Sequence, residues 1–323
     1  MDSASVRNET AKVAYQEGWE WPALADAVAA TSLPQSGWVF VASSRKRAAF
    51  RCPCAGTFAK VTTPEGIDRM VTETAFARWA HDAGVPVAAL LGDVVEQPVI
   101  GLFGAATFWA LYEPVAAEAV DMVWMGRTLA GLHAVKDRLA LPPWDPASWF
   151  DTFMVRLRSN TGLDTDLVHR LASRGGRIID RSGDLAASAQ MVVLHGDAYP
   201  DNVVASDSGP RLIDFELAQL GPAEFDLAPT VVLARRFGFP RSSSLRLLRS
   251  YGDHDPELLN VMVDLAELRV TCGAVAIYSQ HNSFRTELGV RVDSLGDAGQ
   301  TEWTPHRRLL DQLSNSKRIR TDS

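Results

Sequence analysis

The chain has 323 residues, of which 46% are hydrophobic and 22% are charged, and its formal net charge is -7. A chain of this length and composition can bury the cores of two lobes or of one large domain. The acidic balance disfavours a nucleic-acid partner, which would need a basic surface, and suits a cationic small molecule. No signal-peptide pattern and no apolar run of the ~18 residues that a membrane span requires are visible. We therefore expect a cytoplasmic protein without a membrane partner.

The first third of the chain predicts helix followed by antiparallel sheet. Residues 8–31 carry an apolar face at helical spacing and predict one or two short helices. From residue 38 on, the stretches W-V-F-V-A, A-A-F-R-C and T-F-A-K-V-T predict three short strands joined by tight turns. A helix is expected over 68–83, and two further strands over 88–95 and 107–112.

Beyond residue 112 the apolar alternation stops and the character becomes mainly helical. Two short buried strands, M-V-V-L-H-G-D and R-L-I-D-F, interrupt the helices, and the D-S-G-P turn between them predicts a hairpin. We expect an α+β fold of two lobes, a small antiparallel-sheet lobe over 1–112 and a larger, mainly helical lobe over 113–323. The helices of the second lobe are predicted near 119–135, 148–159, 164–174, 177–188 and 256–280.

Three oxygen-bearing side chains follow one another closely in this second region. Residues 194–202 read L-H-G-D-A-Y-P-D-N, and I-D-F-E occupies 213–216. Mg²⁺ prefers oxygen ligands and keeps several waters, so the amide of Asn202 and the carboxylate of Asp214 would suffice to hold it. Asp197, five residues before the asparagine, can act on an acceptor hydroxyl as base or orienter. This set suits phosphoryl transfer from a nucleotide, which needs positioning and charge neutralisation more than covalent chemistry.

The predicted sheet contains a second part of such a site. Lys60, in T-F-A-K-V, can bind nucleotide phosphates if a helix carboxylate fixes it, and Glu73 on the following helix is placed to do so. The first hairpin contains no glycine, but Ser43 and Ser44 can offer N–H groups or hydroxyls to phosphate, with added charge from residues 45–47. The alternative for this hairpin is a solvated basic turn on an edge strand.

These motifs occur together with G-P-A-E-F-D-L-A at 221–228 and L-A-G-L-H at 129–133. In that order they resemble the aminoglycoside phosphotransferase family, whose fold is similar to that of protein kinases. The resemblance implies that Lys60 contacts the phosphates of ATP or GTP, that Glu73 holds the lysine, and that the backbone from Glu113 to Val115 binds the purine edge. It also implies roles in the catalytic loop: Asp197 as catalytic base or hydroxyl orienter, Asn202 and Asp214 as magnesium ligands, and His195 and Asp226 as structural supports.

The resemblance implies transfer of the γ-phosphate of ATP, or of GTP, to a hydroxyl of a small polar molecule such as an aminoglycoside or another antibiotic. The same motifs would serve a kinase of choline, homoserine, a sugar or a fructosamine, because no motif marks the acceptor pocket. A nucleotide-binding pseudo-enzyme is a third alternative, although none of the four polar residues that transfer needs is replaced. Acidic and aromatic candidates for the acceptor pocket are Glu224, Asp226, Asp264, Glu267, Tyr278 and His281.

The three cysteines are interpreted as packing or turn residues. Cys52 and Cys54 form a C-P-C sequence, and Cys272 lies far along the chain. A structural metal site would need four thiolate or imidazole ligands at paired spacing, which are missing. A disulfide would be unusual in a reducing cytosol.

Overall fold

The computed structural model describes residues 18–309, apart from residues 45, 95, 138, 160–162, 280, 298, 300 and 307. The predicted helical segment before residue 18 and the polar tail after residue 309 lie outside the described residues. Contacts group the described chain into two compact units. The first comprises the residues up to Val120, Ala134–Pro142 and His195–Gln219, and the second comprises Asp121–His133, Pro143–Leu194 and the residues from Leu220 on. The units thus interleave in sequence, whereas the predicted lobes are two continuous segments.

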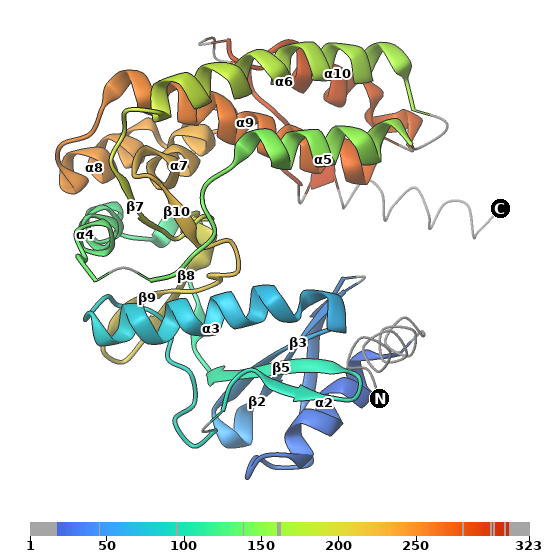
Figure 1. Cartoon of the computed structure of the whole chain (residues 1–323), viewed down its shortest axis with the longest axis vertical. Helices are drawn as coiled ribbons and strands as arrows, with labels where there is room; N and C mark the ends of the chain where they lie inside the picture. Colours follow the sequence, from blue (N-terminus) through green and yellow to red (C-terminus); the bar gives the residue numbers. More distant parts are fainter. Residues whose placement is uncertain are drawn as a thin grey trace. The chain divides into compact units, whose positions relative to one another are not determined.

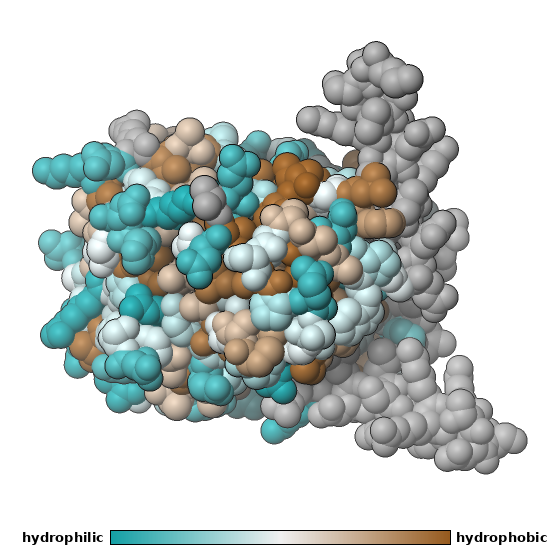
Figure 2. All heavy atoms as spheres, turned by 90° about the horizontal axis from the view of Figure 1, so that it is seen from below, coloured by the Kyte–Doolittle hydropathy of each residue, from teal (hydrophilic) through white to brown (hydrophobic). Residues whose placement is uncertain are grey.

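The first unit contains a five-stranded antiparallel sheet in the order β1-β2-β3-β5-β4 (Figure 1). Its strands are β1 Val39–Ser43, β2 Arg47–Cys52, β3 Thr57–Thr62, β4 Val99–Gly101 and β5 Gly104–Ala110. The first three strands confirm the predicted pattern. Strand β1 is an edge strand, and its side chains are exposed throughout. On the face drawn in Figure 2, apolar side chains are interspersed among polar ones.

The two faces of this sheet carry different side chains because strand residues alternate in direction. One face carries Phe50, Val61 and Phe108, all fully buried, and these pack in one core with helix α2 (Glu20–Ala29). The opposite face carries Lys60 and Trp109, which lie out of phase with those residues in the strand register. The sheet therefore separates a purely apolar core from the face on which the lysine lies.

Helix α3 (Ile67–Asp82) contacts β5 and follows a short 3₁₀ turn, η2 (Pro64–Gly66). Its buried positions include Met70, Glu73, Thr74 and Ala77, which recur at the three- and four-residue spacing of one helix face. Glu73 is the one acidic residue on this buried face, so the helix places a single carboxyl group inside the unit.

The segment predicted as a strand over 88–95 is not a strand in the described residues. Only isolated bridges occur there, from Val87 to Leu212 and from Leu90 to Trp109. The backbone still bonds to β5, because the Leu91 N–H donates to the Phe108 carbonyl at 2.9 Å and the Ala110 N–H donates to the Ala89 carbonyl at 3.0 Å. The side chain of Gln97 adds to this pairing, since its Oε1 accepts the Phe108 N–H at 2.6 Å and its Nε2 donates to the Leu91 carbonyl at 3.1 Å.

The predicted hairpin has a different first strand. Strand β9 (Gly209–Leu212) pairs with β8 (Val203–Ser206), and β8 also pairs with β6 (Glu113–Pro114). Strand β7 (Met191–Leu194), predicted to be the hairpin partner, instead pairs with β10 (Gln219–Pro222). The prediction was wrong because the D-S-G-P turn joins only the residues directly beside it, and a loop from 195 to 202 separates β7 from that turn.

The second unit is mainly helical. Its helices are α4 Met122–His133, α5 Pro146–Arg158, α6 Thr165–Ala186, α7 Glu224–Arg236, α8 Arg241–Tyr251, α9 Pro256–Tyr278 and α10 Arg285–Asp293. Helix α6 merges the two helices predicted over 164–174 and 177–188. The helix continues through the glycine at 175. A Cβ at this position would lie 2.3 Å from the ring of Phe150, so the absence of a side chain allows α5 to pack closely on α6. No helix among the described residues is both long and apolar enough to cross a membrane.

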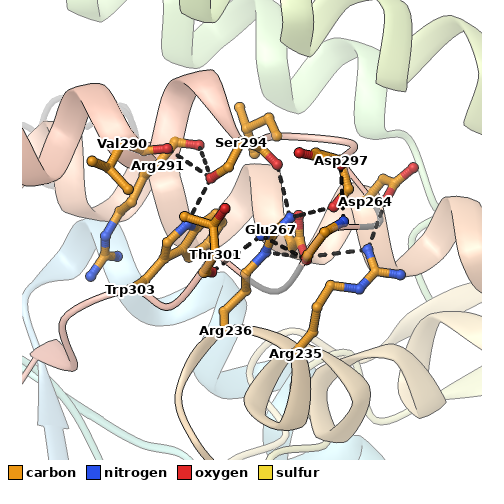
Figure 3. A network of polar contacts seen from close by, with 12 residues as sticks. Arg235, Arg236, Asp264, Glu267, Val290, Arg291, Ser294, Asp297, Thr301 and Trp303 are labelled. Atoms are coloured by element: carbon orange, nitrogen blue, oxygen red, sulfur yellow. Dashed lines mark hydrogen bonds and ion pairs between the residues drawn. The ribbon is translucent and has the colours of Figure 1, made fainter.

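A buried ion pair ties the end of the described chain to this unit (Figure 3). Arg236 and Glu267, both without exposed surface, form two hydrogen bonds of 2.7 and 2.9 Å from α7 to α9. The same guanidinium donates to the carbonyls of Ser294 at 2.8 Å and Asp297 at 2.7 Å, and it stacks over the Trp303 ring at 4.9 Å. The Arg236 guanidinium therefore pairs with the Glu267 carboxylate and also binds backbone carbonyls at residues 294 and 297, which follow the last residue of α10.

Candidate active site

The side chain of Lys60 lies between two carboxylates in the first unit. The strand register sets Lys60 of β3 beside Ala49 of β2 and Thr107 of β5, on the sheet face away from α2. Its Nζ lies 2.5 Å from Glu73 Oε1 and 2.8 Å from Asp214 Oδ1. The predicted contact between Lys60 and Glu73 is therefore present, and Asp214 joins it from a segment 154 residues later in the chain.

Burial and charge act in opposite directions on this cluster. Burial alone would lower the pKa of Lys60, but the two carboxylates raise that pKa well above its usual value. Burial alone would raise the pKa of Asp214, but the nearby lysine ammonium outweighs it and lowers the pKa. Lys60 is thus a cation and Asp214 an anion at neutral pH, which are the charges needed to bind phosphate and a divalent metal.

Asp214 adopts a left-handed backbone conformation, with φ of 70°, and is the one non-glycine residue with positive φ among those described. Aspartate tolerates this region better than most residues, although it remains uncommon. The next residue, Phe215, is fully buried, stacks on Phe76 at 4.8 Å between ring centroids, and meets the edge of the His195 ring at 5.2 Å. The aromatic anchor after Asp214 holds the strained backbone and aims the carboxylate at Lys60.

The loop that carries Asp197 is fixed by the residues before it. His195 is fully buried. Its Nε2 lies 3.0 Å from the Ile213 carbonyl oxygen, and its Nδ1 accepts the Asp197 N–H at 3.2 Å. These partners assign the imidazole proton to Nε2. Gly196 has φ of +83°, and a Cβ there would lie 1.9 Å from the Leu217 carbonyl oxygen. Histidine and glycine are therefore both needed to bring Asp197 into place.

Asn202 links the loop of Asp197 to the segment that follows β9 and carries Asp214. Its Nδ2 donates to the Asp197 carbonyl at 2.8 Å and to Asp197 Oδ2 at 3.0 Å. The backbone carbonyl of Asn202 accepts the Ile213 N–H at 3.0 Å. Since the amide nitrogen is directed at Asp197, the remaining side-chain oxygen is the atom that can serve a metal. Hydrogen bonds thus join Asp197, Asn202 and Ile213, the residue before Asp214.

A cavity of about 510 Å³ opens beside this cluster within the first unit. Its size falls in the range of small-molecule pockets. One end has the polar side chains of Lys60, Glu73 and Asp214, and the rest is mainly apolar. Predicted residues Glu113 and Pro114 line it, but Ser43, Ser44 and Val115 are not among its lining residues. The other lining residues are Phe40, Val41, Arg51, Phe58, Ala88, Trp109, Ala110, Leu111, Tyr112, Val204, Ile213 and Phe215.

Sequence reasoning named the basic first hairpin but not the contact that it makes. Arg47 of β2 forms an ion pair with Glu216, two residues after Asp214. Lys46, its neighbour, pairs instead with Glu65. The sequence shows a glutamate directly after Asp214-Phe215, but its ion pair joins residues 169 positions apart, which local pattern does not determine.

The residues proposed as structural supports have partners of their own. In the second unit, Asp226 Oδ2 lies 3.1 Å from His133 Nε2, and His133 Nδ1 lies 3.0 Å from the hydroxyl of Tyr251. Burial, with the charges of Glu224 and Asp226, raises the pKa of Tyr251 to about 12, so its hydroxyl stays protonated. Four more of the acceptor-pocket candidates also have structural partners: Glu224 accepts the N–H of Asp255, Asp264 pairs with Arg235, Glu267 pairs with Arg236, and Tyr278 contacts His306.

Within the described residues no cluster of three or more His, Cys, Asp or Glu side chains is arranged to hold a metal ion. A nucleotide-bound Mg²⁺ does not need one, since one or two protein ligands suffice when phosphates and waters supply the rest. The oxygen donors of Asn202 and Asp214 fit that ion in chemistry and in their placement on one hairpin.

The model of the phosphotransferase enzyme family matches residues 58–262, more than half of the chain. This confirms the predicted resemblance, and the match covers both Lys60 and the segment from His195 to Asp226. Among curated proteins, no sequence matches the chain.

Solved structures of small-molecule kinases share the fold. A choline/ethanolamine kinase family protein from Mesorhizobium loti is 16% identical with a TM-score of 0.61, over 84% of this chain and 90% of that one. Aminoglycoside phosphotransferase APH(3'')-Id from Streptomyces rimosus, in complex with ADP and streptomycin, is 19% identical with a TM-score of 0.53, over 72% and 92%. Choline kinase LicA from Streptococcus pneumoniae is 13% identical with a TM-score of 0.58, over 81% and 92%.

At these identities the structural likenesses establish the fold, which is the predicted α+β protein-kinase-like fold. The family match establishes the class of chemistry. The chain is a phosphotransferase and belongs to the phosphotransferase enzyme family.

Proposed function

We propose that this enzyme transfers the γ-phosphate of ATP or GTP to a hydroxyl group of a small, polar, cationic molecule. The observation that carries the proposal is the placement of Lys60 Nζ against both Glu73 and Asp214, at the polar end of a cavity large enough for a nucleotide. A lysine held by a helix carboxylate can neutralise phosphate charge, and the apolar part of the cavity suits a purine ring.

The roles of the site residues follow from their partners. Lys60 contacts the nucleotide phosphates, and Glu73 keeps its ammonium in place. The backbone near Glu113 faces the purine edge, since Glu113 and Pro114 line the cavity. Asp197 orients the acceptor hydroxyl and takes up its proton, while the amide of Asn202 holds that carboxylate. Ser43, Ser44 and Val115 remain predicted contacts.

Asn202 and Asp214 would hold Mg²⁺ in this site. When bound, the ion neutralises the charge of the nucleotide phosphates. Asp214 suits this role because its lowered pKa keeps it ionised. The ion pair with Lys60 keeps the carboxylate oriented before a nucleotide arrives.

For the acceptor, we propose an amino alcohol of aminoglycoside type, with a choline-like metabolite as the second candidate. Among the structures of the same fold, one is a complex with streptomycin and another is described as a choline kinase. Both classes pair a hydroxyl with a positive charge, which the net charge of -7 of this chain would attract.

A panel of acceptors tests the proposal directly. The chain is incubated with ATP or GTP, Mg²⁺ and each acceptor in turn, and phosphorylated product is followed by mass spectrometry. We expect transfer to at least one cationic alcohol and its loss on chelation of the divalent ion. Binding of nucleotide with no transfer to any hydroxyl would contradict the proposal and would favour a pseudo-enzyme.

Replacement of Arg47 by alanine is expected to raise the KM for nucleotide about ten-fold, the equivalent of one charge-assisted contact of about 1.4 kcal/mol. Arg47 pairs with Glu216 and lies close enough to lower the pKa of Asp214, so its guanidinium borders the proposed phosphate site.

Lys46→Ala is the matched control for this variant, because Lys46 is the neighbouring cation and pairs with Glu65. Its nucleotide KM is expected to stay near that of the wild type. Equal KM values for the two variants in steady-state kinetics would show that Arg47 has no part in binding phosphate.

A further inference from the structure

The turn between β2 and β3 brings two thiols into contact. Strand β2 ends at Cys52, Pro53 begins a single 3₁₀ turn, and Gly56 closes it with φ of +57°. In this turn the Sγ atoms of Cys52 and Cys54 are 3.3 Å apart, and both cysteines are free thiols. A disulfide bond has an S–S separation of about 2.0 Å, so the two sulfur atoms would have to approach each other by roughly 1.3 Å.

The two thiols differ in their access to solvent. Cys52 has no exposed surface, and burial raises the pKa of its thiol, with a further contribution from Cys54. Cys54 is exposed. A thiol must be reachable to meet an oxidant, so Cys54 can react first and Cys52 second.

The chain leaves little room for the pair to separate. The backbone of Gly37, with φ of +89°, lies against both sulfurs, and a Cβ at that position would be 3.0 Å from Cys54 Sγ and 3.6 Å from Cys52 Sγ. The Cys52 thiol also lies 3.9 Å from the Ser36 carbonyl. The Gly37 backbone and the Ser36 carbonyl thus lie on one side of the pair, while Cys54 stays exposed.

We propose that Cys52 and Cys54 form a reversible thiol–disulfide modification site whose state alters the neighbouring cavity. In the first step, the Cys54 thiolate attacks a low-molecular-weight disulfide, forming a mixed disulfide and releasing one small thiol. In the second, Cys52 Sγ gives up its proton, attacks Cys54 Sγ and releases the second small thiol. The protein loses two electrons and two protons, and the small disulfide is reduced to two thiols.

The turn is connected to the cavity by backbone hydrogen bonds. The Gly56 carbonyl accepts the Leu111 N–H at 2.7 Å, and Thr57 pairs with Ala110 across β3 and β5. Leu111 and Ala110 both line the cavity. Closing the small ring from Cys52 to Cys54 would shift the turn and, through these bonds, the cavity wall. This effect on nucleotide binding rests on the proposed function, whereas formation of the disulfide does not.

Mass spectrometry of the full chain tests the disulfide. The protein is treated with oxidised glutathione, and the remaining thiols are alkylated after unfolding. We expect alkylation to fall from three thiols to one, with a peptide holding Cys52 and Cys54 two hydrogen masses lighter. Cys52→Ser should keep a stable glutathione adduct at Cys54, and Cys54→Ser should keep both remaining thiols. A stable adduct at Cys54 in the wild type, or three free thiols, would overturn the proposal.

Nucleotide affinity tests the coupling. Oxidised and reduced wild-type protein are compared by titration with ADP, with Cys272→Ser as control because Cys272 is buried in the second unit. We expect the Kd to change about three-fold or more on oxidation in both proteins and not in Cys54→Ser. An unchanged Kd in a protein shown to carry the disulfide would overturn the coupling. A reduced protein that binds no nucleotide would instead contradict the proposed function.

Discussion

Asp197→Asn is expected to lower kcat by about 10²–10⁴-fold while changing nucleotide affinity little, which is the usual range for loss of a catalytic base. The amide keeps the shape of the side chain but cannot accept the proton of an acceptor hydroxyl. Asp197 lies in the loop fixed by His195 and Gly196, so the substitution should leave the fold intact. Lys60, Glu73 and the cavity, which are proposed to bind the nucleotide, do not change.

Asp201→Asn provides the matched control, because Asp201 lies four residues away in the same loop and is exposed. Both variants are compared by steady-state kinetics with an active acceptor, and by calorimetric titration with nucleotide. Turnover of Asp197→Asn close to that of Asp201→Asn would remove Asp197 from the chemistry. A parallel loss of nucleotide binding would show that its role is structural.

Glu267→Ala is expected to destabilise the protein by about 3–5 kcal/mol, the usual cost of removing one partner of a buried ion pair. Arg236 has no exposed surface, so its charge would remain buried with the Glu267 bonds lost (Figure 3). The carbonyls of Ser294 and Asp297 would still accept from it, but dipoles do not replace a full negative charge.

Thermal unfolding followed by circular dichroism measures this effect, and a fall in Tm of roughly 10 °C is expected. Glu257→Ala on the same helix is the control, since the Glu257 side chain is 68% exposed and lies 3.9 Å from Arg181, at the long limit of an ion pair. Exposed pairs of this kind contribute about 0–1 kcal/mol. Equal Tm values for the two variants would mean that the buried pair does not stabilise the second unit.

Local sequence pattern predicted those parts of the fold that depend on neighbouring residues. The strands predicted at β2 and β3 and the helix predicted at α3 are present, and they carry Lys60 and Glu73 as expected. The strand predicted over 88–95 is reduced to isolated bridges, although Ala89 and Leu91 still bond to β5 through their backbone. The added contact of the Gln97 side chain with β5 leaves no periodic signal in the sequence.

The same distinction applies to the site. The ordered motifs predicted that Glu73 would hold Lys60, and this contact is present, whereas the ion pair of Lys60 with Asp214 was not predicted. The stack of Phe76 on Phe215 was not predicted, since both phenylalanines fit any apolar core position. The contact of the two cysteine thiols was also missed, because the geometry of the turn rather than the spacing C-P-C decides it.

A crystal structure of the chain with Mg²⁺ and a non-hydrolysable ATP analogue tests the central claim most directly. We predict that the terminal phosphate lies beside Lys60, that one Mg²⁺ is bound by the Asn202 side-chain oxygen and the Asp214 carboxylate, and that Asp197 faces the γ-phosphate. A nucleotide whose phosphates lie away from Lys60, or whose metal contacts neither Asn202 nor Asp214, would contradict the proposed site.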